Sequence, residues 1–203
     1  MMKDQEREIK FYIQDLEGIA ERLRACGADL VRERTLEINL RFDTPDHSLY
    51  KSGRLLRLRQ DDIARVTFKE NARVEGGVMA RTELEFTVDD FAIARKLFES
   101  LGYQVVVTYE KFRRVYCLGD VEVVLDELPF GNFIEIEAPN NILIEGVAHM
   151  LRLDWSRGIA TNYLGLFEIA RTSRAFTFND LTFENFRELS IQPEDMGVMP
   201  ADG

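Results

Sequence analysis

Two carboxylates and one ammonium group alternate near the start of the chain, in the run Glu6-Arg7-Glu8-Ile9-Lys10. In an extended strand every second side chain points to the same face. Glu6, Glu8 and Lys10 would therefore share one face, and Ile9 would lie on the other. Carboxylate oxygens are ligands that Mg²⁺ prefers, and an ammonium group binds phosphate. The run predicts a strand whose polar face handles a charged ligand together with metal ions.

The same alternation of charged and apolar residues recurs in six further predicted strands. Basic residues alternate in three of them, at Arg57, Arg59, Arg65, Lys69, Lys111 and Arg113. Acidic residues alternate in the other three, at Glu83, Glu85, Glu122, Asp126, Glu135 and Glu137. A single strand of this kind is typical of a sheet with one wet face. A merely solvated face would mix the two signs, so their segregation favours two charged walls.

Turn residues and hydrophobic periodicity divide the chain into strands and amphipathic helices. Strands are predicted at residues 5–14, 30–43, 54–60, 63–70, 79–88, 103–117, 120–128 and 132–138. Helices are predicted at residues 15–26, 90–101, 140–152 and 156–172. Most strands are linked by hairpins, and the helices need the apolar strand faces to pack on. We therefore expect an α+β fold, an eight-stranded antiparallel barrel or tunnel with a charged interior and helices packed outside.

Charged side chains that point into such a barrel cannot remain unpaired, because buried charge is costly. A wet tunnel that takes up a polyanion and divalent cations would solve this problem. The basic wall would bind phosphate oxygens, and the acidic wall would hold the metal ions. The metal ions would then bridge the carboxylates to the phosphates.

Composition excludes several other classes of protein. The 203 residues carry a net charge of −10 with a pI of about 4.8, which argues against nucleic-acid binding. No run of about 18 apolar residues is present, so no membrane span is expected. The charged N-terminal residues do not resemble a signal peptide. Cys26 and Cys117 form no ligand or disulfide motif, and a cytoplasmic location is expected.

Seven motifs follow one another in order between residues 5 and 170. They are Glu6-x-Glu8-x-Lys10, Arg41-Phe-Asp-Thr-Pro-Asp46, Gly53-Arg-Leu-Leu-Arg57-Leu-Arg59, Thr67-Phe-Lys69, Arg81-Thr-Glu83-Leu-Glu85, Lys111-Phe-Arg113 and Leu125-Asp126-Glu-Leu-Pro-Phe-Gly-Asn-Phe-Ile-Glu135-Ile-Glu137. This ordered set resembles the CYTH superfamily, also called triphosphate tunnel metalloenzymes. The resemblance implies an eight-stranded antiparallel tunnel that binds a triphosphate with Mg²⁺ or Mn²⁺.

The resemblance also implies a role for each matching residue. The metal ligands would be Glu6, Glu8, Asp126, Glu135 and Glu137. The triphosphate would be bound by Lys10, Arg57, Arg59, Lys69, Arg81, Lys111 and Arg113. The catalytic residues would be Lys10, Glu83, Glu85 and Lys111, with the two glutamates orienting a nucleophile or a second metal ion.

Members of the superfamily include class IV adenylate cyclases, thiamine triphosphatases and inorganic triphosphatases. The long motif that ends at Glu137 is most like the cyclase branch, so our first prediction is a class IV adenylate cyclase that converts ATP to cyclic AMP and pyrophosphate. The enzyme alternative is a hydrolase of inorganic triphosphate or thiamine triphosphate. A non-catalytic nucleotide- or polyphosphate-binding module and a plain solvated β-sheet protein are two further alternatives. The full carboxylate set favours catalysis, because binding a polyanion needs only the basic wall.

The chain is expected to divide into a CYTH domain at residues 1–172 and a partly flexible C-terminal extension at residues 173–203. The tail from about residue 190 is rich in Pro, Gly and Asp, so it is expected to be loose. Before it lies an apolar cluster of Phe176, Phe178, Leu181, Phe183 and Phe186. These side chains would pack on the barrel within the chain, or form the contact of a homodimer.

Overall fold

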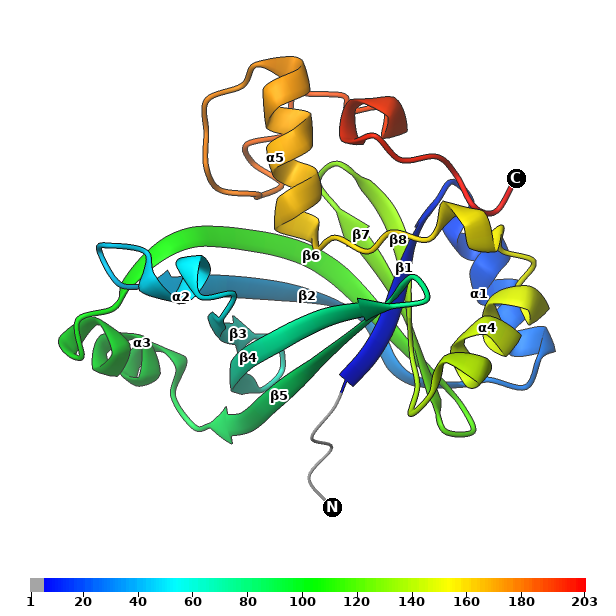
Figure 1. The fold of residues 1–203 in the computed structure, drawn as a ribbon, viewed down its shortest axis with the longest axis horizontal. Coiled ribbons are helices and arrows are strands. Elements are labelled where there is room, and N and C mark those ends of the chain that lie inside the picture. Colours follow the sequence, from blue (N-terminus) through cyan, green and yellow to red (C-terminus); the bar gives the residue numbers. More distant parts are fainter. Residues whose placement is uncertain (1–5) are drawn as a thin grey trace.

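Eight antiparallel strands form a closed ring in the computed structural model, which describes residues 6–203 apart from the side chains of Glu6 and Glu75. They are β1 (Glu6–Ile13), β2 (Asp29–Asp43), β3 (Leu55–Gln60), β4 (Ala64–Glu75), β5 (Val78–Val88), β6 (Gln104–Leu118), β7 (Val121–Leu128) and β8 (Gly131–Glu137). Their order around the ring is β1-β5-β4-β3-β2-β6-β7-β8 (Figure 1). The predicted eight-stranded antiparallel fold is confirmed.

Five α-helices accompany the strands in the described part of the chain. They are α1 (Leu16–Ala25), α2 (Ser48–Lys51), α3 (Phe91–Ser100), α4 (Asn141–Met150) and α5 (Tyr163–Arg174). In four of them the side chain before the first helical residue accepts a backbone N–H, as is typical of an N-cap. These capping residues are Asp15, Asp90, Asn140 and Asn162.

Two helices differ from their predictions. The helix predicted at residues 156–172 begins only at Tyr163, because Asn162 is its cap and the N–H of Ile159 instead donates to the carbonyl of Lys10 at 2.7 Å. The short helix α2 was not predicted. The carboxylate of Asp43 accepts the N–H groups of Leu49 and Tyr50 within it, both at 2.9 Å, and so stabilises its first turn.

The hydrophobic core lies outside the ring, between the strands and the helices. In β1, Ile9 and Phe11 are buried in one cluster with Ile19 and Leu23 of α1, while Lys10 points the other way. A second cluster joins the outer faces of β2, β3 and β4 to α3. The helices therefore cover the apolar strand faces, and the charged faces point into the ring (Figure 1), as the alternation predicts.

The C-terminal segment packs on the barrel instead of lying loose. Phe178 and Phe186 lie in an aromatic cluster with Phe167 of α5, and within-chain packing of these side chains is confirmed. The tail itself returns to the start of the fold, where the N–H of Ala201 donates to the carbonyl of Tyr12 at 3.0 Å. The division of the chain at residue 172 stays a prediction.

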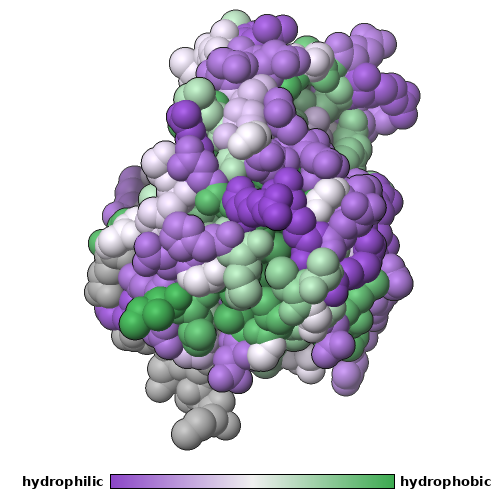
Figure 2. All heavy atoms as spheres, turned by 90° about the vertical axis from the view of Figure 1, so that its right-hand side faces the viewer, coloured by the Kyte–Doolittle hydropathy of each residue, from purple (hydrophilic) through white to green (hydrophobic). Residues whose placement is uncertain are grey.

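An apolar area lies on the outer face that carries α1 and α4. Figure 2 shows this face, with a hydrophobic area in its lower half below hydrophilic atoms. Ile142 and Met150 of α4 are 82% and 51% exposed. The predicted homodimer remains a prediction. Among the described residues, no helix is long and apolar enough to cross a membrane.

Candidate active site

The interior of the ring encloses a cavity of about 490 Å³, here called the tunnel. Most of the residues predicted to act on the ligand line it: Glu8, Lys10, Arg57, Arg59, Lys69, Arg81, Glu83, Glu85, Lys111, Arg113, Glu135 and Glu137. The side chain of the predicted ligand Glu6 lies outside the described residues. Asp126 does not line the cavity, since its side chain is fully buried.

A second cavity of about 790 Å³, here called the vestibule, adjoins the tunnel at one end. Both cavities are lined by Glu8, Lys10, Arg41, Lys69 and Arg81. The vestibule extends to the α2 region, to β6 and to the start of α5, through Tyr50, Arg54, Val107 and Asn162. A ligand longer than the tunnel could therefore continue into the vestibule.

Sheet register brings the basic side chains together on one wall of the tunnel. Arg57 on β3 lies between Arg41 on β2 and Thr67 on β4. Its guanidinium donates to the Tyr109 hydroxyl and to Thr67 Oγ1, each at 3.2 Å. Burial raises the pKa of Tyr109, but the nearby charges of Arg57 and Lys111 outweigh it and lower that pKa below its usual value.

Carboxylates face this wall, and several of them pair with a basic side chain of the chain itself. Glu135 lies opposite Lys10 in the β1–β8 pair, and their charged groups are 2.7 Å apart. Burial opposes the charge of Glu135, yet Lys10 and Arg113 hold its pKa well below the usual value. Glu83 pairs with Lys69 in the same way, at 2.7 Å.

Asp126 is surrounded by donors on every side. It accepts from Lys111 at 2.9 Å, from Arg113 at 2.6 and 2.7 Å, and from the Tyr163 hydroxyl at 2.8 Å. Its carboxylate therefore neutralises the basic wall in this arrangement. A metal ligand role for Asp126 stays a prediction.

Tyr163 was missed by sequence reasoning. It is the first residue of α5, and its ring lies 4.6 Å from the ammonium of Lys10 and 5.3 Å from that of Lys111. Burial raises the pKa of its hydroxyl well above the usual value, and the charge of Asp126 raises it further. The hydroxyl thus stays protonated and donates. No sequence pattern places a helix start over a tunnel, so no signal could have found it.

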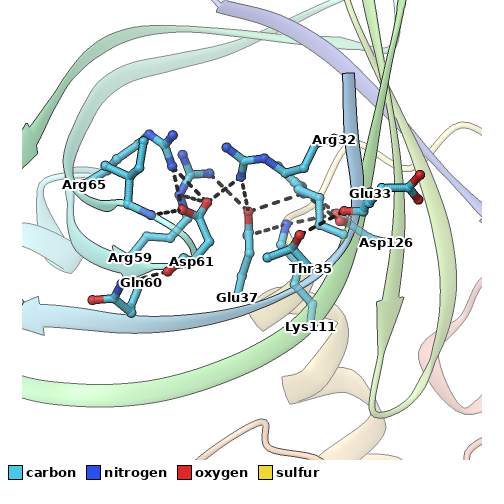
Figure 3. A network of polar contacts seen from close by, with 12 residues as sticks. Arg32, Glu33, Thr35, Glu37, Arg59, Gln60, Asp61, Arg65, Lys111 and Asp126 are labelled. Carbon is cyan, nitrogen blue, oxygen red and sulfur yellow. Dashed lines mark hydrogen bonds and ion pairs between the residues drawn. The ribbon is translucent and has the colours of Figure 1, made fainter. Parts of the chain in front are cut away.

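Glu37 was also missed, although it lies at the centre of a charged network (Figure 3). Its side chain is fully buried, and neither oxygen accepts a hydrogen bond. Arg59, Lys111 and Arg113 surround it at 3.5, 3.7 and 3.9 Å. Burial raises its pKa, but these cations outweigh burial and lower the pKa to about 2. The alternation of Glu37, Asn39 and Arg41 in the predicted strand at 30–43 was a signal that could have found it.

Asp61 extends this network at the same end of the ring. Its carboxylate accepts from Arg32 at 2.5 Å and from Arg65 at 2.8 Å, and lies 3.8 Å from Arg59 (Figure 3). Sequence reasoning treated Asp61 only as part of a hairpin turn. The structure shows that this turn residue supplies counter-charge to three arginines.

The acidic wall has the chemistry of a divalent-cation site. Glu8 on β1 lies opposite Glu137 on β8, which lies opposite Glu122 on β7. Like charges placed directly opposite one another destabilise a sheet, whereas Mg²⁺ or Mn²⁺ among these oxygens would offset the repulsion. In residues 6–203 no three such side chains converge closely enough to hold a metal ion. In the type of its donor atoms, the acidic wall fits a divalent cation.

The CYTH domain family model matches residues 4–142, which is more than half of the chain. The chain belongs to the CYTH family. Proteins of this family are generally metal-dependent and are adenylate cyclases or triphosphatases.

Three individual proteins are similar to this CYTH chain. Adenylate cyclase CyaB of Aeromonas hydrophila is 29% identical over 132 residues, which cover 64% of this chain and 67% of the relative. The structure of a candidate adenylate cyclase from Vibrio parahaemolyticus matches with a TM-score of 0.70 at 20% identity, covering 79% of this chain and 95% of that one. HpAC1 from Hippeastrum matches with a TM-score of 0.57 at 18% identity, covering 96% of this chain and 100% of that one, and is described as having a dominant triphosphatase activity. At these identities the two structures show a shared fold.

Proposed function

We propose that this protein is a metal-dependent enzyme that processes a triphosphate in the tunnel. The observation that carries the proposal is the opposition of charge inside one enclosed cavity. Arg57, Arg59 and Lys111 lie on the basic side, and Glu8, Glu135 and Glu137 lie on the acidic side. Guanidinium and ammonium groups bind phosphate oxygens strongly, and oxygen donors bind the cation that accompanies a triphosphate.

The residues of the acidic wall that would hold the cation are Glu8, Glu122, Glu135 and Glu137. Such a cation, when bound, neutralises phosphate oxygens and polarises the bond under attack. The chain itself contributes positioning and electrostatic stabilisation. Lys10, Lys69, Arg81 and Arg113, with the three basic residues named above, would orient the phosphates and stabilise the charge that develops on them.

Two reactions are compatible with this site. Our first candidate is cyclisation of ATP, supported by the name of the Aeromonas relative. In this reaction the ribose 3′-hydroxyl attacks the α-phosphorus and pyrophosphate leaves. The second candidate is hydrolysis of inorganic or thiamine triphosphate by attack of water on a terminal phosphorus, an activity class named for the Hippeastrum neighbour.

Glu83 and Glu85 are the carboxylates placed to orient the nucleophile in either reaction. Glu85 lies on the tunnel wall and accepts from Thr67 Oγ1 at 2.8 Å, with Arg59 at 3.3 Å. Its half-exposed carboxylate is thereby held in one orientation. Glu83 is tied to Lys69, so the two residues act from fixed positions.

Phosphorus NMR tests the proposal and separates the reactions. The protein is incubated with Mg²⁺ or Mn²⁺ and with ATP, thiamine triphosphate or inorganic triphosphate in parallel. Cyclic AMP and pyrophosphate from ATP establish the cyclase. Orthophosphate from inorganic or thiamine triphosphate, with ATP left intact, establishes the hydrolase instead. Binding without turnover at saturating ligand and metal would make the protein a non-catalytic module.

A further inference from the structure

Arg41 lies on β2 at the junction of the tunnel and the vestibule, and it lines both cavities. Register places it directly opposite Arg57 of β3 and Val107 of β6. It belongs to none of the sets of residues that the motifs assign to substrate, metal or catalysis. Its position is therefore open to a separate explanation.

The other cations of the tunnel have partners within the chain. Lys69 is paired with Glu83 at 2.7 Å, Arg81 with Glu8 at 2.9 Å, and Lys111 with Asp126 at 2.9 Å. Arg57 donates to two hydroxyls, and Arg59 and Arg113 contact carboxylates. Arg41, in contrast, has neither a hydrogen bond nor an ion pair with any residue in the described part of the chain. Its Nε is buried without an acceptor, as are the Nε atoms of Arg57 and Arg59.

The nearest acidic residue on the same strand face does not serve as its partner. The carboxylate of Asp43 accepts backbone N–H groups from Thr44 at 2.7 Å and from Leu49 and Tyr50 at 2.9 Å each. Its hydrogen bonds therefore stabilise α2 and the turn before it. Burial lowers the pKa of Arg41, as do the neighbouring charges of Arg57 and Arg81, whereas Tyr109 and Asp43 raise it and offset part of this effect.

A guanidinium carries five N–H donors, and donors that are buried without acceptors cost free energy. The buried Nε of Arg41 is such a donor, and an anion bound at the guanidinium would supply its acceptor. Phosphate is the anion that suits it best, because a guanidinium binds two phosphate oxygens side by side. Arg57 and Arg81 would add to the attraction.

We propose that Arg41 binds a phosphate group of the ligand at the junction of tunnel and vestibule, and so extends the basic wall by one position. This inference rests on the proposed triphosphate function. Arg41 fixes the end of the phosphate chain that emerges toward Tyr50 and Asn162. It thereby sets the direction in which the ligand lies in the tunnel.

Isothermal titration calorimetry tests this assignment with a bismethylene analogue of inorganic triphosphate, whose P–C bonds resist cleavage, in the presence of Mg²⁺. Arg41→Gln should weaken binding at least about tenfold, the scale of a lost charge-assisted hydrogen bond. Arg54→Gln is the matched control, because Arg54 is an exposed arginine of the same vestibule. We expect it to change the affinity less than twofold. Arg41→Lys keeps the charge without the planar fork and should bind with intermediate affinity.

The melting temperature of the ligand-free variants separates a ligand role from a structural role. Arg41→Gln and Arg41→Lys should melt at or above the wild-type temperature, since an unsatisfied guanidinium is removed. A lower melting temperature for both variants would mean that Arg41 supports the fold, and would overturn the proposal. Unchanged affinity of Arg41→Gln, with normal binding by the wild type, would overturn it as well.

A different outcome of the same titration tests the proposed function itself. If the wild-type protein does not bind the analogue at all, both the triphosphate function and this inference are wrong. A bismethylene analogue of ATP provides the remaining arm. A loss of affinity for the ATP analogue alone would mean that Arg41 contacts the nucleoside and not a phosphate, which contradicts the proposal. A loss for both analogues supports it.

Discussion

Glu37 and Arg41 lie on the same strand and face the same tunnel, yet their surroundings are opposite. Glu37 is fully buried and has four cations at 3.5 to 4.0 Å. Arg41 forms no ion pair among the described residues, and Asp43 on the same strand offsets only part of its charge. One end of β2 is therefore neutralised by the chain itself, and under our proposal the other is neutralised by a phosphate group of the ligand. Not every basic side chain of a tunnel that binds a polyanion has to be without a counter-charge. The position of the internal carboxylates determines which basic side chains remain available to the ligand.

The largest expected effect concerns Glu8, which, like Arg41, lines both the tunnel and the vestibule. Glu8→Ala should reduce turnover by at least about 100-fold, the loss of roughly 3 kcal/mol of transition-state stabilisation. Its melting temperature should stay close to that of the wild type. Steady-state rates on the substrate identified by NMR, together with thermal unfolding, provide the check. Full activity of Glu8→Ala would remove Glu8 from the proposed metal ligands.

Glu37→Gln should show the reverse pattern, with a large effect on stability. Removing this buried carboxylate leaves Arg59, Lys111 and Arg113 with less counter-charge, and breaking a buried ion pair costs about 3–5 kcal/mol. Denaturant unfolding measures the free energy of unfolding. Glu33→Gln is the control, since Glu33 is an exposed carboxylate of the same strand. If Glu37→Gln is as stable as the control, the charged network around Glu37 does not stabilise the fold.

Acid should destabilise the protein through the same residue. The pKa of Glu37 is about 2 in the folded protein, below its usual 4.5. Its contribution is therefore complete above about pH 5 and disappears as pH falls toward 2. The difference corresponds to about 3 kcal/mol. Unfolding measured between pH 6 and pH 2.5 should show this loss, and Glu37→Gln should show a smaller one. Parallel pH profiles for the two proteins would contradict the assignment.

The smallest effect is expected at Tyr163, which joins α5 to the basic wall. Tyr163→Phe keeps the ring against Lys10 and Lys111 but removes the hydrogen bond to Asp126, a loss of about 1 kcal/mol. Tyr50→Phe is the matched control, because Tyr50 is 75% exposed. Equal unfolding free energies for the two variants would mean that the Tyr163 hydroxyl does not hold Asp126.

Sequence patterns predicted the strands well, because the period-two alternation of residues such as Ile9 and Lys10 reflects a strand with one buried face. They also predicted which face is charged. They did not predict which charges pair, since contacts such as Lys111 with Asp126 depend on register between strands. Glu37 was overlooked although Glu37, Asn39 and Arg41 alternate in the second half of β2, because the first half of this long strand is exposed and shows no such alternation.

Tyr163 and the C-terminal segment show a second reason for missing features. The residues before α5 run alongside β1, where the N–H of Ile159 donates to the carbonyl of Lys10. This path of the chain determines where the helix starts. Likewise, the Pro, Gly and Asp content of residues 190–203 is typical of loose tails, yet Met196 and Ala201 are buried. Tertiary contacts override local composition in both places.

The closure of the ring has a consequence for how this protein folds during synthesis. β1 pairs on one side with β8, so Lys10 must meet Glu135. Until β8 has left the ribosome, β1 has only a short pairing with β5, and its polar face has no completed enclosure. Such pairings between distant residues form slowly. The cavity is thus assembled at a late stage, when β8 meets β1.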